Sequence, residues 1–363
     1  MKKFTFTPLA IAVLALMSAS CVNSNYNLDD AKVTATIEVN KNSELNSDSL
    51  LGFKEEAGIS KDANGDFRIE LPSKEIIAPA PVTPDAPVVF DGTLDVDMVT
   101  APDIFHKSSG GEIANPGIKI SISNPSPKPA ALSAKVSVDG KPAIKLPVVD
   151  IPASSEVDIV FSKDINDPAA PGEVYAALPK ELADILVLGI DNGFSVSDIA
   201  LEPATKAAYG SASTLAVPSK YVAKAAFVAQ AAFTAKKAIH LQIPFNSLKF
   251  NLKDYIGDLG KTEFKVNFTG TNYLPFRLEI GAEARTATGK LSGKLDKKLE
   301  PGTPSKGTDF ESVLDVTCDT AALDGSEFDV VLDVTLEPAY DGILVLNPAH
   351  TIKIHTDKIK ILK

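Results

Sequence analysis

The sequence predicts an all-β protein built from tandem antiparallel β-sandwich domains of the Ig-like or Greek-key kind. Apolar and polar residues alternate with a period of two in many short segments, which is typical of strands with one buried and one solvated face. The 25 prolines lie mainly between these segments, where they rigidify turns without interrupting a hydrogen-bonded ladder. Strands are therefore expected at residues 118–122, 132–138, 239–245, 264–268, 278–285 and 328–336.

Helix is expected in one short segment, residues 179–185, where LPKELADI could form one or two turns. The Ala-rich stretch 221–238 is ambiguous, because alanine favours helix while Phe227 and Phe233 lie six residues apart. We favour a strand there, since the stretch runs directly into the alternating segment that follows Ala238.

An internal repeat supports the tandem arrangement. Asn124 follows one predicted strand, a proline comes three residues later, and a second strand then ends in Gly-Lys. The same order recurs 148 residues further on, beginning at Asn272. Each copy reads as a strand, a proline-rigidified crossing and a returning strand, an arrangement that suits a β-sandwich.

The N-terminus has the order of a secretory signal peptide. Lys2 and Lys3 precede the apolar run 4–17, and the small residues 18–20 follow it. This order is typical of a cleaved signal, and the run is shorter than the roughly 20 apolar residues that span a bilayer.

Cys21 comes directly after the small residues, and the segment resembles a bacterial lipobox. The resemblance implies cleavage after Ser20 and acylation of the Cys21 thiol, with palmitate among the acyl chains. Met17 departs from the leucine that is commoner at its position, and a plain signal peptide with an incidental cysteine is the alternative. Each buried methylene contributes about 0.8 kcal/mol, so several acyl chains would anchor the protein firmly.

The segment after Cys21 is polar and ends in Asp29 and Asp30. It resembles the acidic cue that directs lipoproteins of the Bacteroidetes to the cell surface, so we expect an outer-membrane, surface-exposed location. An orientation toward the periplasm stays open. The net charge of −11 argues against nucleic acid as a partner.

The expected organisation has five parts. A signal peptide at 1–20 is followed by a lipidated tether at 21–30 and an N-terminal β region at 31–85. Two β-sandwich domains complete the chain, the first at 86–245 and the second at 246–363. The boundary near residue 85 rests on the proline-rich stretch 78–89, which is typical of a semi-rigid linker.

The lipobox, the two Asn-x-x-Pro strand pairs and the closing strand 351–363 together resemble surface lipoproteins of the Bacteroidetes with tandem β-sandwich modules. A second resemblance is to fimbrillin-type pilus proteins of the same phylum. It implies trimming near the N-terminus by an Arg-directed protease, for which Arg68 is the candidate processing site. An ordinary arginine on a hairpin strand is the favoured interpretation of Arg68.

No pattern of catalytic residues emerges, and we expect no enzymatic activity, no cofactor and no metal. The four histidines lack metal-ligand spacing, and no nucleophile elbow or glycine-rich phosphate loop occurs. A pair of catalytic carboxylates stays open as an alternative, although no pair stands out.

Asp62, Asn64 and Asp66 alternate as calcium ligands do at the start of an EF-hand loop. However, Phe67 stands where that loop needs glycine, and no Glu occupies the twelfth position. The Asn64-Gly65 pair is also a strong hairpin signal. We favour a hairpin turn and keep calcium as the alternative.

The expected function is that of a non-enzymatic outer-membrane lipoprotein, held to the membrane by its lipid and acting in adhesion or in binding a protein, glycan or nutrient. A fimbrillin-like pilus subunit or anchor is one alternative. A glycan-binding lipoprotein of a nutrient-uptake system is another, although the chain has no tryptophan, the side chain that makes the best platform for a sugar.

Overall fold

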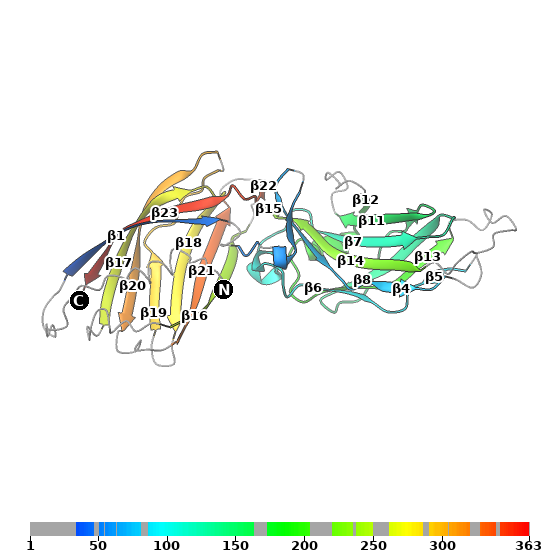
Figure 1. The fold of residues 1–363 in the computed structure, drawn as a ribbon, viewed down its shortest axis with the longest axis horizontal. Helices are drawn as coiled ribbons and strands as arrows, with labels where there is room; N and C mark the ends of the chain where they lie inside the picture. Colours follow the sequence, from blue (N-terminus) through cyan, green and yellow to red (C-terminus); the bar gives the residue numbers. More distant parts are fainter. Residues whose placement is uncertain are drawn as a thin grey trace. The chain divides into compact units, whose positions relative to one another are not determined.

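Strands make up most of the computed structural model, and the predicted all-β class is confirmed (Figure 1). Within the three larger sheets, neighbouring strands run antiparallel except for the parallel pair β11 (Ser155–Ser162) and β12 (Glu173–Ala177). The structure describes residues 34–46, 51–53, 55–62, 64–80, 86–162, 173–203, 220–234, 237–249, 261–285, 290–303, 305–319, 327–338 and 342–362.

The chain divides into two compact units, one of which is inserted into the other. The inserted unit is the continuous segment Lys54–Thr234. The framing unit combines the chain up to Phe53 with Ala235–Lys363. Its first strand, β1 (Thr34–Asn46), precedes the insertion, and its second, β16 (Ile239–Lys249), follows it.

The inserted unit contains two sheets. The seven-stranded sheet consists of β2 (Ile59–Lys61), β3 (Phe67–Pro72), β4 (Ile76–Ala78), β7 (Gly117–Asn124), β11 (Ser155–Ser162), β12 (Glu173–Ala177) and β14 (Tyr221–Gln230). The six-stranded sheet consists of β5 (Val88–Val89), β6 (Leu94–Asp97), β8 (Ala130–Val138), β9 (Ile144–Lys145), β10 (Val149–Ile151) and β13 (Gly193–Pro203).

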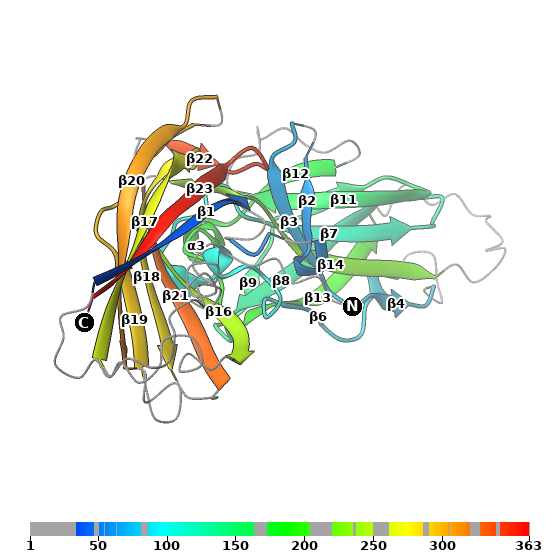
Figure 2. The ribbon, with the colours of Figure 1, turned by 60° about the vertical axis from the view of Figure 1, so that its left-hand side comes forward.

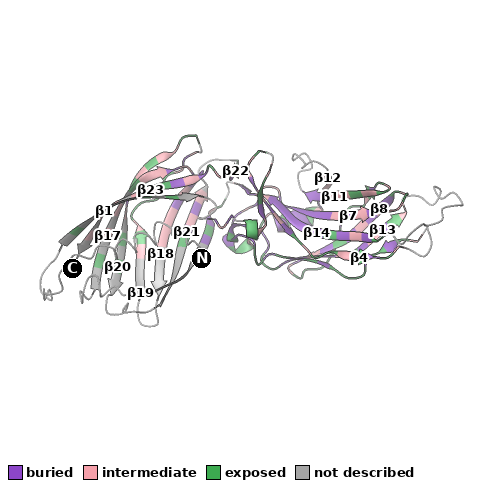
Figure 3. Ribbon diagram, viewed as in Figure 1, coloured by how far each residue is buried: buried purple, intermediate pink, exposed green. Residues whose placement is uncertain are grey.

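The strand order of the first sheet is β12-β11-β7-β14-β3-β2, with β4 beside β14. That of the second is β10-β8-β13-β5, with β6 beside β13 and β9 beside β8. Alternate residues of β8 are buried, as the period-two pattern predicts, whereas the first four residues of β7 are all buried (Figure 3). The unit also contains the strand β15 (Ala232–Thr234), the helix α3 (Lys180–Leu186) and the 3-10 turns Glu55–Ala57, Asp103–Phe105 and Lys107–Ser109.

The framing unit contains one eight-stranded antiparallel sheet. Besides β1 and β16 it consists of β17 (Lys261–Asn272), β18 (Phe276–Arg285), β19 (Lys290–Leu295), β20 (Thr308–Asp319), β21 (Glu327–Pro338) and β23 (Thr351–Leu362). Their order in the sheet is β1-β23-β17-β20-β19-β18-β21-β16. The short strand β22 (Ile343–Val345) precedes β23.

Both units follow the same strand plan. In the inserted unit β3, β14, β7 and β11 are successive neighbours, and β8, β13 and β5 form a second series. In the framing unit the series are β1, β23, β17 and β20, and then β18, β21 and β16. Corresponding strands also come in the same order along the chain. The framing unit differs because β19 pairs with both β18 and β20 and joins the two series into one sheet.

A buried asparagine marks the same turn in both units. The Asn124 side chain donates Nδ2 hydrogen bonds to the carbonyls four and 28 residues later, at 3.0 and 2.9 Å, and its Oδ1 accepts the amide two residues later at 3.2 Å. Asn272 makes the same three bonds at the same sequence spacings, at 3.2, 2.8 and 3.0 Å. Both side chains are 0% exposed. The structure therefore supports the internal repeat that the sequence indicated.

Several predicted elements are confirmed. All six segments expected as strands lie in strands. The Ala-rich stretch forms β14 and β15, and the predicted helix is α3, at Lys180–Leu186.

The division into units differs from the predicted one. The proline-rich stretch 78–89 joins β4 to β5, and these strands pair with β14 and β13 of the same unit, so no unit boundary falls near residue 85. Residue 246 lies inside the continuous strand β16. The N-terminal β region is also shared, since β1 pairs with β23 of the framing unit whereas β3 pairs with β14 of the inserted unit.

Candidate functional site

The residues of the predicted lipidation site, Ser20 and Cys21, lie outside the described residues. Within the described part of the chain, no helix is long and apolar enough to cross a membrane. In the same part, no group of three or more histidine, cysteine and acidic side chains is arranged to hold a metal ion.

The segment that contains Asp62, Asn64 and Asp66, the alternative calcium ligands, forms the hairpin turn between β2 and β3. The Asp62 carboxylate accepts the backbone amides of Asn64 at 2.8 Å and Asp66 at 3.0 Å through Oδ1. Gly65 has a φ of 84°, the left-handed region that such turns require and glycine adopts at little cost. Asp62 Oδ2 accepts a 3.0 Å bond from Gln230 Nε2. This carboxylate therefore closes the hairpin and ties it to β14.

Arg68 is the second residue of β3, where it pairs with Ser60 of β2 and Gln230 of β14. Its Nη2 forms a 2.7 Å ion pair with Glu173 of β12. The two side chains are 19% and 6% exposed. Burial lowers the pKa of Arg68, but the hydrogen bond and the charge of Glu173 outweigh it, so the pKa is raised. As a protease site, Arg68 would differ from the exposed loop tips where cleavage concentrates.

The Arg68–Glu173 pair shows that the seven-stranded sheet is strongly curled. Three strands, β14, β7 and β11, separate β3 from β12 in the sheet order, yet the two side chains meet. In Figure 2 the strands β2, β3 and β12 lie near one another. The outer face of the sheet, which bears Arg68, is therefore concave.

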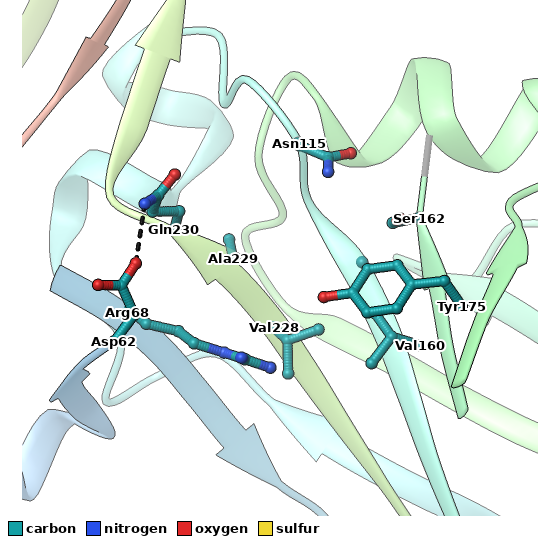
Figure 4. A pocket seen from close by; sticks show the side chains of 10 residues that line it. Asp62, Arg68, Asn115, Val160, Ser162, Tyr175, Val228, Ala229 and Gln230 are labelled. Atoms are coloured by element: carbon teal, nitrogen blue, oxygen red, sulfur yellow. Dashed lines mark hydrogen bonds between the residues drawn. The ribbon is translucent and has the colours of Figure 1, made fainter. Parts of the chain in front are cut away.

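A small hollow occupies this concave face (Figure 4). Its volume is about 60 Å³. The floor is apolar, and Val160 and Val228 are among its members, with exposures of 3% and 4%. Polar side chains surround it, and the sticks show the Tyr175 hydroxyl pointing toward its centre. The lining residues are Asp62, Arg68, Asn115, Gly117, Val160, Ser162, Tyr175, Val228, Ala229 and Gln230.

Gly117 leaves the space in the floor. A Cβ there would lie 2.9 Å from the Phe161 carbonyl oxygen and 3.3 Å from methyl carbons of Val160 and Val228. Such contacts are tighter than ordinary van der Waals separations. Any larger side chain at this position would therefore have to displace the floor or fill the hollow.

The charged groups of the hollow are held by partners within the fold. The Arg68 guanidinium is paired with Glu173, and the Tyr175 hydroxyl lies 3.4 Å from the other oxygen of the same carboxylate. Asp62 is bonded by two amides and by Gln230, whose Nε2 therefore faces the carboxylate. This bond fixes the orientation of the Gln230 amide and directs its oxygen away from Asp62 (Figure 4).

The corresponding place in the framing unit carries an ion pair. Counting seven residues back from each buried asparagine gives Gly117 in one unit and Lys265 in the other, and their neighbours across the ladder are Ser162 and Asp315. Lys265 Nζ and Asp315 Oδ1 form a 3.0 Å ion pair. The hydrogen bond and the charge of Asp315 raise the pKa of Lys265. The hollow is thus a feature of the inserted unit and not of the shared strand plan.

The sequence did not single out the hollow, whose lining comes from five separate strands, the β2–β3 turn and the segment before β7. One signal was present, because extending the repeat from Asn124 and Asn272 toward the N-terminus aligns Gly117 with Lys265. Each of the four histidines makes a hydrogen bond within the fold. His106 lies 3.3 Å from the Ala101 carbonyl, and His350 accepts the Asn347 amide at 3.0 Å; His240 and His355 bond Thr335 and Asn42.

No family model and no curated protein matches the chain. Among solved structures, the chain is similar to a predicted secreted protein from Parabacteroides distasonis, with 11% identity and a TM-score of 0.45 over 91% of this chain and 99% of that one. It also resembles a structure of the Gx strain of infectious bursal disease virus, with 9% identity and a TM-score of 0.18 over 97% of this chain and 83% of that one. Structural similarities this distant do not support a conclusion about function.

Proposed function

We propose that the protein is a non-enzymatic lipoprotein of the outer membrane, held by acyl chains on Cys21 and exposed at the cell surface. It acts in adhesion or in binding a partner. In this proposal the framing unit receives the tether, and the inserted unit presents the binding surface.

The observation that carries the proposal is the path of the chain from Cys21. The predicted tether leads into β1, which begins at Thr34 and pairs with β23 along nearly its whole length. The inserted unit is reached only after β1 and returns to the framing unit at β16. An anchor at Cys21 would therefore attach directly to the framing unit. The inserted unit, which contains the hollow, would be connected to the anchor only through the framing unit.

The chemistry of the described residues supports a binding role over catalysis. The acidic and basic groups around the hollow are paired with each other or with backbone amides. A general acid or base needs a pKa near the working pH and a proton path to substrate. Around the hollow, the carboxylates of Asp62 and Glu173 are already held by donors of the fold, so binding is the simpler role.

A Cys21→Ser variant tests the anchor. Serine cannot take a thioether-linked lipid, so the variant is expected in the soluble fraction while the wild type stays with the outer membrane and incorporates labelled palmitate. Protease added to intact wild-type cells should degrade the protein while a periplasmic marker survives. A variant that stays with the membrane, or wild-type protein that is protected, would contradict the proposal.

A glycan is the partner class that one observation favours. The hollow combines an apolar floor with amide, hydroxyl and guanidinium groups, which is the composition of a small polar-ligand site. In the described side chains, however, no Phe or Tyr is exposed, so a flat aromatic platform for a polysaccharide chain does not occur there.

A further inference from the structure

We infer that the hollow over Gly117 binds an uncharged, hydroxyl-bearing group, and that its ligand is one terminal residue of a saccharide. The inference rests on the proposed binding role and gives it a ligand class. Three observations carry it: the pairing of the charges around the hollow, its size, and its replacement by an ion pair in the framing unit.

The pairing of charges selects a neutral ligand. Arg68 is neutralised by Glu173 at 2.7 Å, and Asp62 is bonded by two amides and Gln230. An anion entering the hollow would meet the negative Asp62 carboxylate while Arg68 is already paired, and a cation would have to compete with two amides and Gln230 for the Asp62 oxygens. Either ion would also lose hydration, which is unfavourable in a partly buried site. A neutral ligand avoids that cost.

The polar lining selects hydroxyl groups. Arg68 and Asn115 carry N–H donors, the Gln230 amide turns its oxygen away from Asp62, and Tyr175 and Ser162 carry hydroxyls. A sugar hydroxyl both donates and accepts, so it suits a lining in which donors and acceptors are mixed. The carbon skeleton of the same sugar would lie against Val160 and Val228.

The volume limits what enters. A water molecule needs about 10 to 15 Å³ of such space, so a hollow of about 60 Å³ holds a few water-sized groups. This is well below the several hundred Å³ of a pocket that encloses a whole metabolite. The hollow therefore receives one edge of a sugar ring, and the rest of the glycan stays in solvent. Affinity for a single sugar is expected in the millimolar range.

The framing unit supplies the internal comparison. On the same strand plan, Lys265 and Asp315 occupy the positions of Gly117 and Ser162 and form an ion pair there. The strand plan therefore does not require a hollow at this place. It also provides the substitution that should remove the hollow, because the ion pair can be copied onto the inserted unit.

The experiment uses the purified full chain and saturation-transfer NMR. The probes are the methyl glycosides of glucose, galactose, mannose and N-acetylglucosamine, with acetate and ethylammonium as ionic probes of small size. We expect saturable transfer to at least one glycoside, and none to either ion. The Gly117→Lys, Ser162→Asp double variant should lose the transfer, whereas the matched variant Lys265→Ala in the framing unit should keep it.

Circular dichroism and thermal unfolding establish that each variant is folded. If the double variant fails to fold, Gln230→Met removes the amide at similar side-chain size, and it should weaken the glycoside at least several-fold. The inference is overturned if no glycoside binds, if an ion binds in preference, or if binding survives in the folded double variant or in Gln230→Met. Membrane anchoring is measured separately, by cell fractionation of the Cys21→Ser variant. A negative result in the glycoside-binding experiment therefore does not affect the test of anchoring, and the reverse also holds.

Discussion

The inserted and framing units share a strand plan and a buried asparagine turn, but they use the outer face of the sheet differently. At equivalent ladder positions one unit has Gly117 beside Ser162 and a hollow, and the other has Lys265 beside Asp315 and a solvated ion pair. The features common to both units are buried and hydrogen-bonded. The comparison teaches that the interior defines the scaffold, while a few outward side chains decide whether a unit offers a binding surface.

The second difference is β19. In the framing unit this strand pairs with β18 and β20 and joins the two series of strands. In the inserted unit, the chain between β8 and β11 instead forms the short strands β9 and β10, both of which pair with β8. The inserted unit therefore keeps two separate sheets, and its seven-stranded sheet curls until Arg68 and Glu173 meet.

The largest expected effect comes from the shared asparagines. Asn124→Ala or Asn272→Ala would remove a fully buried side chain and leave two carbonyls and one amide, at buried or part-buried positions, without their bonds. Each buried polar group left without a partner costs about 1–3 kcal/mol, so we expect a loss of about 3 kcal/mol or more per substitution. Urea unfolding measures it, with the exposed Asn64→Ala as control. A loss no larger than that of the control would show that the turn is not held by its side chain.

The next effect concerns the ion pair that closes the curled sheet. Arg68→Met would leave the Glu173 carboxylate, 6% exposed, without its guanidinium, at a cost of about 3 kcal/mol. Adding Glu173→Gln should recover much of this loss, because a neutral amide is easier to bury. Thermal unfolding of both single variants and the double variant gives the coupling. Independent, additive losses would mean that the pair does not hold β3 to β12.

A smaller effect is expected on the stability of the framing unit at acidic pH. Burial raises the pKa of Asp296, but the Val313 amide and the Ser312 hydroxyl, each 2.8 Å from Oδ1, more than offset it, so the pKa lies below its usual value. The stabilisation is therefore complete above the unfolded pKa of about 3.9 and is lost as the pH falls through the folded pKa. Asp296→Asn should flatten the acid side of the stability curve of the framing unit. An unchanged curve would contradict this role.

The smallest effect is expected from the solvated ion pairs on the framing unit. Arg277 forms hydrogen bonds of 3.0 and 3.1 Å with Glu300 and lies 3.8 Å from Glu337. These side chains are 29–56% exposed, so salt screens them. Arg277→Ala should lower the melting temperature slightly at low salt, and this difference should vanish at high salt. A large, salt-independent decrease would indicate that Arg277 contributes through packing.

Much of the fold could be predicted from the sequence. The period-two alternation located the strands, and the continuity of the Ala-rich stretch with the alternation after Ala238 identified β14 in spite of the helical preference of alanine. The Asn64-Gly65 pair marked the β2–β3 hairpin. These signals are local, since each depends on neighbouring residues that share one strand or one turn.

The features that could not be predicted depend on distant pairings. The insertion follows from β1 pairing with β23, strands separated by roughly the length of the chain. The hollow depends on Arg68 meeting Glu173, 105 residues away, because the sheet curls. No local pattern encodes either contact. The repeat came nearest, since it already aligned the two asparagines that the structure places in equivalent turns.

Hydrogen exchange followed by mass spectrometry tests the two-unit account most directly. With Asn124→Ala, the account predicts faster amide exchange confined to residues 54–234, and with Asn272→Ala, faster exchange confined to the strands of the framing unit, β1 included. Acceleration across both units from either single substitution would contradict the account, because it would show one cooperative structure in place of two separately stabilised copies.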